Sequence, residues 1–261
     1  MNKWRGLLLG TLLVFLPVSG IAFADADPVS INVTVSGQVR DTIVTFMGFS
    51  SPNAFLTIQE DGAVVATFSA NPSGGFNRSL GTRIPGTHSY GIFAEDEAGR
   101  TTPTYGFVLN LLSRTETTVS NLLLPTTIDV TVTTGANIFG STYPTSQVTI
   151  FVHSDPITET AIAAGSGNWS KAFNNLASGH HTASARVSRS GGLQSVDSNE
   201  VSFDILCTFG LSDLNADGRV DLTDFSILLY YWGTSHRPGD VSCDGTIDLT
   251  DFSIMMYHWT G

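Results

Sequence analysis

The sequence predicts a mainly β protein: two tandem β-sandwiches followed by a small helical domain. Short runs of alternating apolar and polar residues, separated by turns rich in Gly, Pro, Asn and Ser, fill most of the chain and are typical of strands. Only 13% of the 261 residues are charged, which favours strands and turns over long helices. The helical part is predicted from a loop-and-helix pattern that occurs twice near the C-terminal end.

Residues 1–24 have the pattern of an export signal, with early basic residues, an apolar run from Leu7 to Val18, and Ala22-Phe23-Ala24 at the cleavage position. We therefore expect a protein that is secreted or held at the cell surface. The alternative is an uncleaved membrane anchor, although the run is shorter than the roughly 20 apolar residues that span a bilayer. No later segment is long enough, so no membrane span is expected after cleavage.

The formal net charge of −11 excludes one class of partner. Binding to a phosphate backbone needs clustered Lys and Arg, but Lys171 is the only lysine after the export signal and the arginines are scattered. No nucleic-acid partner is expected.

Residues 25–115 are predicted to form the first sandwich. Turn signals such as Asp61-Gly62 and Pro85-Gly86 separate the apolar runs, and their spacing suggests antiparallel sheets. Residues 113–127 are interpreted as a boundary. The predicted strands are Ile31–Val35, Ala54–Ile58, Ala63–Phe68, Gly75–Leu80, Ser89–Phe93 and Tyr105–Leu109.

Residues 116–206 repeat this rhythm and are predicted to form a second copy of the sandwich. Ser51–Ile58 parallels Tyr143–Ile150, and Gly74-Gly75-Phe76 parallels Gly165–Trp169. The predicted strands are Ile128–Val132, Ser146–Val152, Trp169–Phe173, His181–Val187 and Val201–Ile205.

A family resemblance rests on three features: the turn at Gly167-Asn168-Trp169, the strand beginning Gly179-His180-His181, and the hairpin Asp96–Gly99, which occurs in the first copy only. They resemble bacterial immunoglobulin-like surface modules. The resemblance implies the sandwich fold and a spacer or adhesive role, and no particular chemistry.

No catalytic constellation is evident in the two sandwiches. The acidic run Glu95-Asp96-Glu97 is interpreted as a solvated turn, and His180 and His181 should face opposite sides of a sheet. No nucleophile elbow or phosphate-binding loop is present. We predict no enzyme. A glycoside hydrolase component, which needs two facing carboxylates, is the less favoured alternative, and Trp169 is the only tryptophan that could mark a polysaccharide-binding surface on the sandwiches.

The duplicated pattern near the C-terminal end predicts two calcium sites. A 12-residue loop binds Ca²⁺ through positions 1, 3, 5, 7, 9 and 12, with Gly at position 6, where a Cβ would clash in the sharp turn. Gly218 and Gly245 occupy that position. Because Ser242 is a neutral ligand, the second site should be weaker. The predicted ligands are Asp213, Asn215, Asp217, the Arg219 carbonyl, Asp221 and Asp224 in the first loop, and Asp240, Ser242, Asp244, the Thr246 carbonyl, Asp248 and Asp251 in the second.

Each loop leads into an apolar helix. Asp221 and Asp248 are predicted to be N-caps, with Asp224 and Asp251 in the first turn. The two helices should pack face to face through one apolar stripe on each. The predicted stripes are Phe225, Leu228, Leu229 and Trp232, and Phe252, Met255, Met256 and Trp259.

Paired calcium loops with Asp at position 12, each followed by a single helix, make residues 207–261 resemble a dockerin domain of type I. The resemblance implies two Ca²⁺ ions and a cohesin as partner. Where dockerins of the cellulosome type often carry Ser-Thr pairs at positions 10 and 11, this chain has Leu-Thr. The predicted partner-binding residues are Leu222, Thr223, Ile227, Tyr231, Leu249, Thr250, Ile254 and His258, which would contact a cohesin-like receptor or the adjacent sandwich.

Cys207 and Cys243 are the only cysteines, and an exported chain can pair them in a disulfide. Two free thiols are the alternative. Taken together, the sequence predicts an exported, non-catalytic modular protein that attaches to a protein partner in a calcium-dependent way. The alternative function is a non-catalytic or glycan-binding subunit of a polysaccharide-degrading complex.

Overall fold

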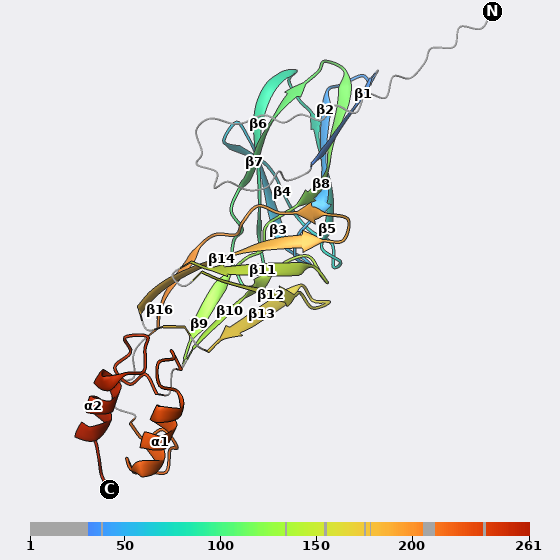
Figure 1. Ribbon diagram of the computed structural model, residues 1–261. Coiled ribbons are helices and arrows are strands. Elements are labelled where there is room, and N and C mark those ends of the chain that lie inside the picture. Colours follow the sequence, from blue (N-terminus) through green and yellow to red (C-terminus); the bar gives the residue numbers. More distant parts are fainter. Residues whose placement is uncertain are drawn as a thin grey trace, which may run out of the picture.

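The structure is a computed structural model that describes residues 31–261 except 38, 134, 154–155, 175, 178, 206–211 and 237–238. It confirms the predicted mainly β architecture, with two β-sandwiches followed by a pair of short helices (Figure 1). The predicted export signal, residues 1–24, lies outside the described residues. No helix in the described part of the chain is long and apolar enough to cross a membrane.

The first sandwich consists of two four-stranded sheets with its core between them. Its strands are β1 (Asn32–Gly37), β2 (Ile43–Phe49), β3 (Phe55–Glu60), β4 (Ala63–Ser69), β5 (Gly75–Thr82), β6 (Gly86–Glu95), β7 (Tyr105–Leu111) and β8 (Thr115–Leu123). One sheet has the order β1-β8-β2-β5 and the other β4-β3-β6-β7. Apolar residues of both sheets point into the core, and Phe46, Leu56, Ile58 and Ile92 are fully buried.

Strand β8 belongs to the first sandwich, although the sequence suggested a boundary there. It pairs antiparallel with β1 and parallel with β2. Val119, Leu122 and Leu124 are buried in the first core. The strand pairing therefore extends the first sandwich beyond the predicted boundary between residues 115 and 116, to about Leu124.

The second sandwich has the sheet orders β13-β10-β9 and β12-β11-β14-β15, and its last strand, β16, pairs with β14. Its strands are β9 (Asp129–Val132), β10 (Ala136–Ser141), β11 (Gln147–Val152), β12 (Ile157–Ile162), β13 (Asn168–Phe173), β14 (Gly179–Arg189), β15 (Leu193–Gln194) and β16 (Val201–Ile205). Trp169 lies in the core, 4% exposed, and its Nε1 donates to Thr126 Oγ1 at 2.6 Å. It is a core residue and not a surface platform for a glycan.

The backbone repeats the same turn in both sandwiches, as the sequence landmarks predicted. The amide of Ser50 donates to the carbonyl of Gly74 at 2.8 Å, and that of Thr142 donates to Gly167 at 2.9 Å. Both glycines have positive φ, +78° and +85°. A Cβ on either would lie 2.4 Å from the carbonyl oxygen of residue 50 or 142, so glycine is required for this close approach as well as for the backbone angle.

The first side of the junction between the sandwiches is built around Asp96, which the sequence suggested was solvated. Its side chain is only 2% exposed. Oδ1 accepts from the backbone amides of Ala98 and Arg100, and Oδ2 accepts from Arg100 Nε at 2.8 Å and from Thr127 Oγ1 at 2.6 Å. Burial raises the pKa of Asp96, but the hydrogen bonds from Thr127 and Arg100 outweigh burial and hold its pKa below the usual value. Since Thr127 follows the first sandwich, this carboxylate connects the two domains.

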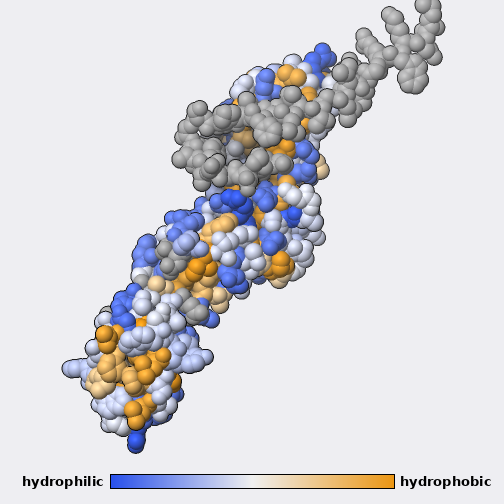
Figure 2. All heavy atoms as spheres, in the orientation of Figure 1, coloured by the Kyte–Doolittle hydropathy of each residue, from blue (hydrophilic) through white to orange (hydrophobic). Residues whose placement is uncertain are grey.

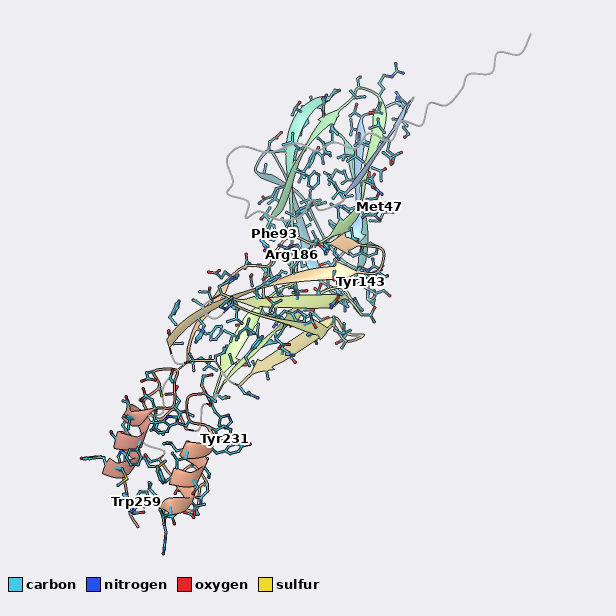
Figure 3. All side chains as sticks on the ribbon, in the orientation of Figure 1. Met47, Phe93, Tyr143, Arg186, Tyr231 and Trp259 are labelled. Carbon is cyan, nitrogen blue, oxygen red and sulfur yellow. The ribbon has the colours of Figure 1, made fainter. Side chains whose placement is uncertain are left out.

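A cation packed against two aromatic rings, which themselves meet edge-on, forms the second side of the junction. The Arg189 guanidinium lies 4.0 Å from the ring centre of Phe49 in the first sandwich and 4.1 Å from that of Tyr143 in the second. Figure 3 shows Tyr143 at the level where the two sandwiches meet. Asn199 Nδ2 also donates to the carbonyl of Thr101 at 2.9 Å. Contacts on both sides of the junction restrict bending between the sandwiches.

The helix pair consists of α1 (Leu222–Tyr230) and α2 (Leu249–Tyr257). Its core contains Val220 and Ile247 from the loops and Leu228 and Met255 from the helices. The predicted apolar stripes are partly wrong, because Leu229, Met256 and Trp232 are 48%, 47% and 41% exposed. The short helices cross at Phe225 and Phe252, whose ring centres are 5.2 Å apart.

Each loop is also bonded to the segment that follows the other loop's helix. The amide and carbonyl of Val220 bond to Thr260 Oγ1 at 2.8 Å and to the Thr260 amide at 3.0 Å. In the other half, Ile247 donates to the carbonyl of Thr234 and accepts from Gly233, both at 2.9 Å. The two loop-helix units are thereby clasped to each other.

Candidate functional site

The two predicted calcium loops have the same backbone shape. In the first, Gly218 donates its amide to Asp213 Oδ2 at 2.8 Å; in the second, Gly245 donates to Asp240 Oδ2 at 3.0 Å. Both glycines have positive φ, +88° and +90°. A Cβ would meet nothing within 4 Å at either position, so the expected clash is wrong and the backbone angle alone requires glycine.

The last acidic residue of each loop connects the loop to its helix. Asp224 Oδ1 accepts from the amides of Leu214 and Asn215, while its Oδ2 accepts from the amide of Asp221 at 2.9 Å. Asp251 repeats these contacts with Ser242 at 2.8 Å and Asp248 at 2.7 Å. These bonds form a capping box at each helix start, which confirms the N-cap prediction for Asp221 and Asp248.

The carboxylates of the second loop converge. Oxygen atoms of Asp240, Asp244 and Asp251 lie within 4.8 Å of one another. Ser242 Oγ donates to Asp240 Oδ1 at 3.3 Å, so another predicted side-chain ligand borders the same group. In the first loop, Asn215 Nδ2 donates to Asp217 Oδ2 at 2.9 Å, which draws those two predicted ligands together.

These residues fit a hard divalent cation. Asp224 and Asp251 are fully buried, and among the described residues no lysine, arginine or histidine forms an ion pair with them. Burying a carboxylate without a counter-charge is costly, whereas a bound cation would compensate for it. Carboxylate, amide and backbone carbonyl oxygens are the ligands that Ca²⁺ prefers. The remaining predicted ligands, the Arg219 and Thr246 carbonyls, lie in the same loops.

Cys243 lies at the fourth position of the second loop and takes part in a disulfide. A free thiol is thus excluded for this residue. Cys207, the other cysteine of the chain, lies outside the described residues. Cys243 has φ +61°, and Ala216, at the same position of the first loop, has φ +59°, so the two loops keep one conformation despite the different side chains.

The helix pair exposes more apolar surface than the sequence indicated. Leu222 and Leu249, both predicted to bind a partner, are 70% and 68% exposed. Tyr230 and Tyr257, which the prediction missed, are 80% and 86% exposed. Figure 2 shows apolar residues gathered on the visible face of this domain. The helical spacing places Leu222, Leu229 and Tyr230 on one side of α1. This exposed stripe could be identified only after Leu228 was found in the core.

The other predicted partner-binding residues differ in exposure. Thr223, Thr250 and His258 are exposed, while Ile227 and Ile254 are half-buried. Tyr231 packs at the edge of the core, with its ring 3.6 Å from that of His236. Figure 3 shows Tyr231 beside α1 and Trp259 at the opposite end of the helix pair.

The family comparison agrees with this geometry. Residues 211–258 match the family model of the dockerin type I domain. The C-terminal segment is a dockerin domain. Dockerin type I domains generally bind calcium, and their partners are proteins called cohesins. No curated protein matches the chain.

Three solved structures show a weak likeness to the chain. One is a tetra-tandem repeat in the extending region of a large adhesion protein, at 18% identity and a TM-score of 0.26, covering 62% of this chain and 50% of that one. A second is the BSP domain of a biofilm-associated protein, at 19% identity and 0.27, covering 65% and 29%. A third is the fibronectin(III)-like modules of Clostridium thermocellum CbhA, at 11% and 0.24, covering 66% and 93%. TM-scores this low carry no argument, and the fold rests on strand order and pairing.

Proposed function

We propose that this is an exported, non-catalytic attachment protein whose dockerin domain binds two Ca²⁺ ions and docks on a cohesin-like receptor. The observation that carries the proposal is the buried acidic residue at the end of each loop. Asp224 and Asp251 each hold loop and helix together, so an ion bound by these carboxylates would fix the helix positions that a partner contacts. The two sandwiches serve as a spacer.

The docking face is the pair of exposed apolar stripes on the helices. We place at its centre Leu222 and Tyr230 from α1 and Leu249 and Tyr257 from α2. Large exposed apolar and aromatic side chains gathered on a small domain are typical of a protein-binding surface. Thr223 and Thr250 lie beside the leucines and supply hydrogen-bonding groups at the rim. The adjacent sandwich is the competing occupant of this face.

The experiment is a pull-down with the full chain from the source organism's culture supernatant, with captured proteins identified by mass spectrometry. The expected result is one protein with a cohesin module, captured in calcium and released by chelator. A Leu222→Asp, Leu249→Asp double variant should lose it. Leu112→Asp, which replaces an exposed leucine on the first sandwich, should retain it. Capture of the protein in the presence of chelator, or by the double variant, would overturn the proposal.

A further inference from the structure

A groove of about 1060 Å³ runs along the junction between the two sandwiches. It is separate from the dockerin domain, because its lining comes only from residues 52–170. Domain junctions are frequent places for ligand sites, and this volume suits a ligand of several rings.

The floor of the groove is the outer face of strands β10 and β13. Trp169 points into the core, so its neighbours Asn168 and Ser170 point outward. Phe139 pairs with Ser170 in the sheet register and is half-buried, so part of its ring is accessible on the floor beside Arg100. Asn137, two residues before Phe139 in β10, lies on the same face of the strand.

The first sandwich supplies the opposite wall, and its side chains are held in place. The Arg100 guanidinium lies 5.2 Å from the centre of the Phe139 ring and is bonded to the buried Asp96. Asn53 Nδ2 donates to Glu97 Oε1 at 3.0 Å. Side chains fixed by such contacts lose little entropy when a ligand binds.

Several polar groups of the floor have hydrogen-bonding capacity to spare. Within the described part of the chain, the side chains of Asn137, Asn168 and Ser170 make no hydrogen bond. Each amide offers both donors and an acceptor. The charged groups of the groove are Asp96, Glu97 and Arg100, so it has no excess of positive charge for an anion.

We propose that this groove binds a neutral oligosaccharide. Unpaired side-chain amides can bond to neighbouring sugar hydroxyls, and an accessible phenyl ring can contact the apolar C–H face of a sugar ring. An acidic polysaccharide is disfavoured by Glu97 and by the net charge of −11. An extended peptide, which could instead pair with the edge strand β13, is the competing outcome.

The experiment is affinity electrophoresis of the full chain through gels that contain galactomannan, xyloglucan, mixed-linkage β-glucan or, as the acidic comparison, polygalacturonate. We expect retardation by at least one neutral polysaccharide, insensitive to chelator, and a loss of about tenfold in affinity for an Asn137→Ala, Asn168→Ala double variant. Asn110→Ala, which removes an exposed amide on the first sandwich outside the groove, should behave as the parent.

The proposal would be overturned by no retardation with any neutral polysaccharide, by stronger retardation with polygalacturonate, or by equal retardation of the double variant. If polyproline or another extended peptide bound instead and depended on Asn137 and Asn168, the groove would be a peptide site and the oligosaccharide assignment would be wrong. Thermal unfolding of each variant checks that the junction is intact. Because chelator abolishes docking and spares this binding, failure here is distinguishable from failure of the attachment proposal.

Discussion

Replacement of Asp96 by Asn tests whether the two sandwiches unfold as a unit. The carboxylate is buried, pairs with Arg100 at 2.8 Å and accepts the Thr127 hydroxyl at 2.6 Å. The Asn side chain keeps one acceptor but places an NH₂ group against donors and leaves the guanidinium without its counter-charge. Breaking a buried pair costs about 3–5 kcal/mol. For a unit of two coupled domains, a loss of about 3 kcal/mol lowers the melting temperature by on the order of 6–12 °C.

Differential scanning calorimetry of the full chain in calcium is the assay. We expect the sandwich transition of the parent to be single and that of Asp96→Asn to be lower and broadened or split, since the junction no longer couples the domains. Glu97→Gln is the matched control, because that neighbouring carboxylate is exposed and should change the melting temperature little. Because the pKa of Asp96 is depressed, its stabilisation is present near neutral pH and is lost as the pH falls through that pKa. A shift no larger than that of the control would refute the reasoning.

Two further predictions concern protonation and metal. His88 Nδ1 lies 2.7 Å from Asp61 Oδ2 and its Nε2 lies 2.9 Å from the carbonyl of Ile84, so only the doubly protonated ring can donate to both acceptors. The hydrogen bond to Asp61 raises the pKa of His88, and the resulting stabilisation is full below the unfolded value of about 6.5 and is lost as the pH rises through the folded pKa. In urea unfolding, His88→Gln should therefore destabilise the chain by about 1 kcal/mol more near pH 5 than near pH 8. The control is His180→Gln, which breaks an exposed pair and should show little difference. An equal loss of unfolding free energy at both pH values for His88→Gln would contradict the prediction. Chelator should lower the melting temperature of the helical circular dichroism signal and leave the β transition in place, because an ion at a hundred times its Kd stabilises by about 2.7 kcal/mol. Calorimetric titration with Ca²⁺ should then find two sites, the second weaker because Ser242 is a neutral ligand. A single site would show that one of the two loops does not bind calcium.

The sequence predicted most of the architecture because short strands and capped helices follow from local patterns. Five strands were missed: β2, β8, β10, β12 and β15. Ile43–Phe49 is nearly continuous in apolar residues and β8 is rich in threonine, so neither of these two shows clean alternation. The burial of Asp96 could not be predicted, since it depends on Thr127 from the next domain. The same holds for the groove beside it, whose floor and wall come from different sandwiches.

At the helix pair, the local sequence pattern did not identify which apolar stripe faces the core, for a different reason. A short helix rich in Leu, Tyr and Trp can place several stripes toward a core, and the loop residues Val220 and Ile247 decide which one is used. The stripe with Leu228 and Met255 is buried, while Leu229 and Met256 are exposed. The ligand positions stay a prediction, which rests on the fixed spacing of ligands in a 12-residue calcium loop.

The clasp between the two loop-helix units has a thermodynamic consequence. Val220 is bonded to Thr260, beyond α2, and Ile247 to Gly233 and Thr234, beyond α1. Whatever orders one loop therefore also restrains the end of the opposite helix. Linkage between two such sites is reciprocal, so each loop should raise the affinity of the other by the same factor. The duplicated unit would then respond to a change in cation concentration more steeply than either half could alone.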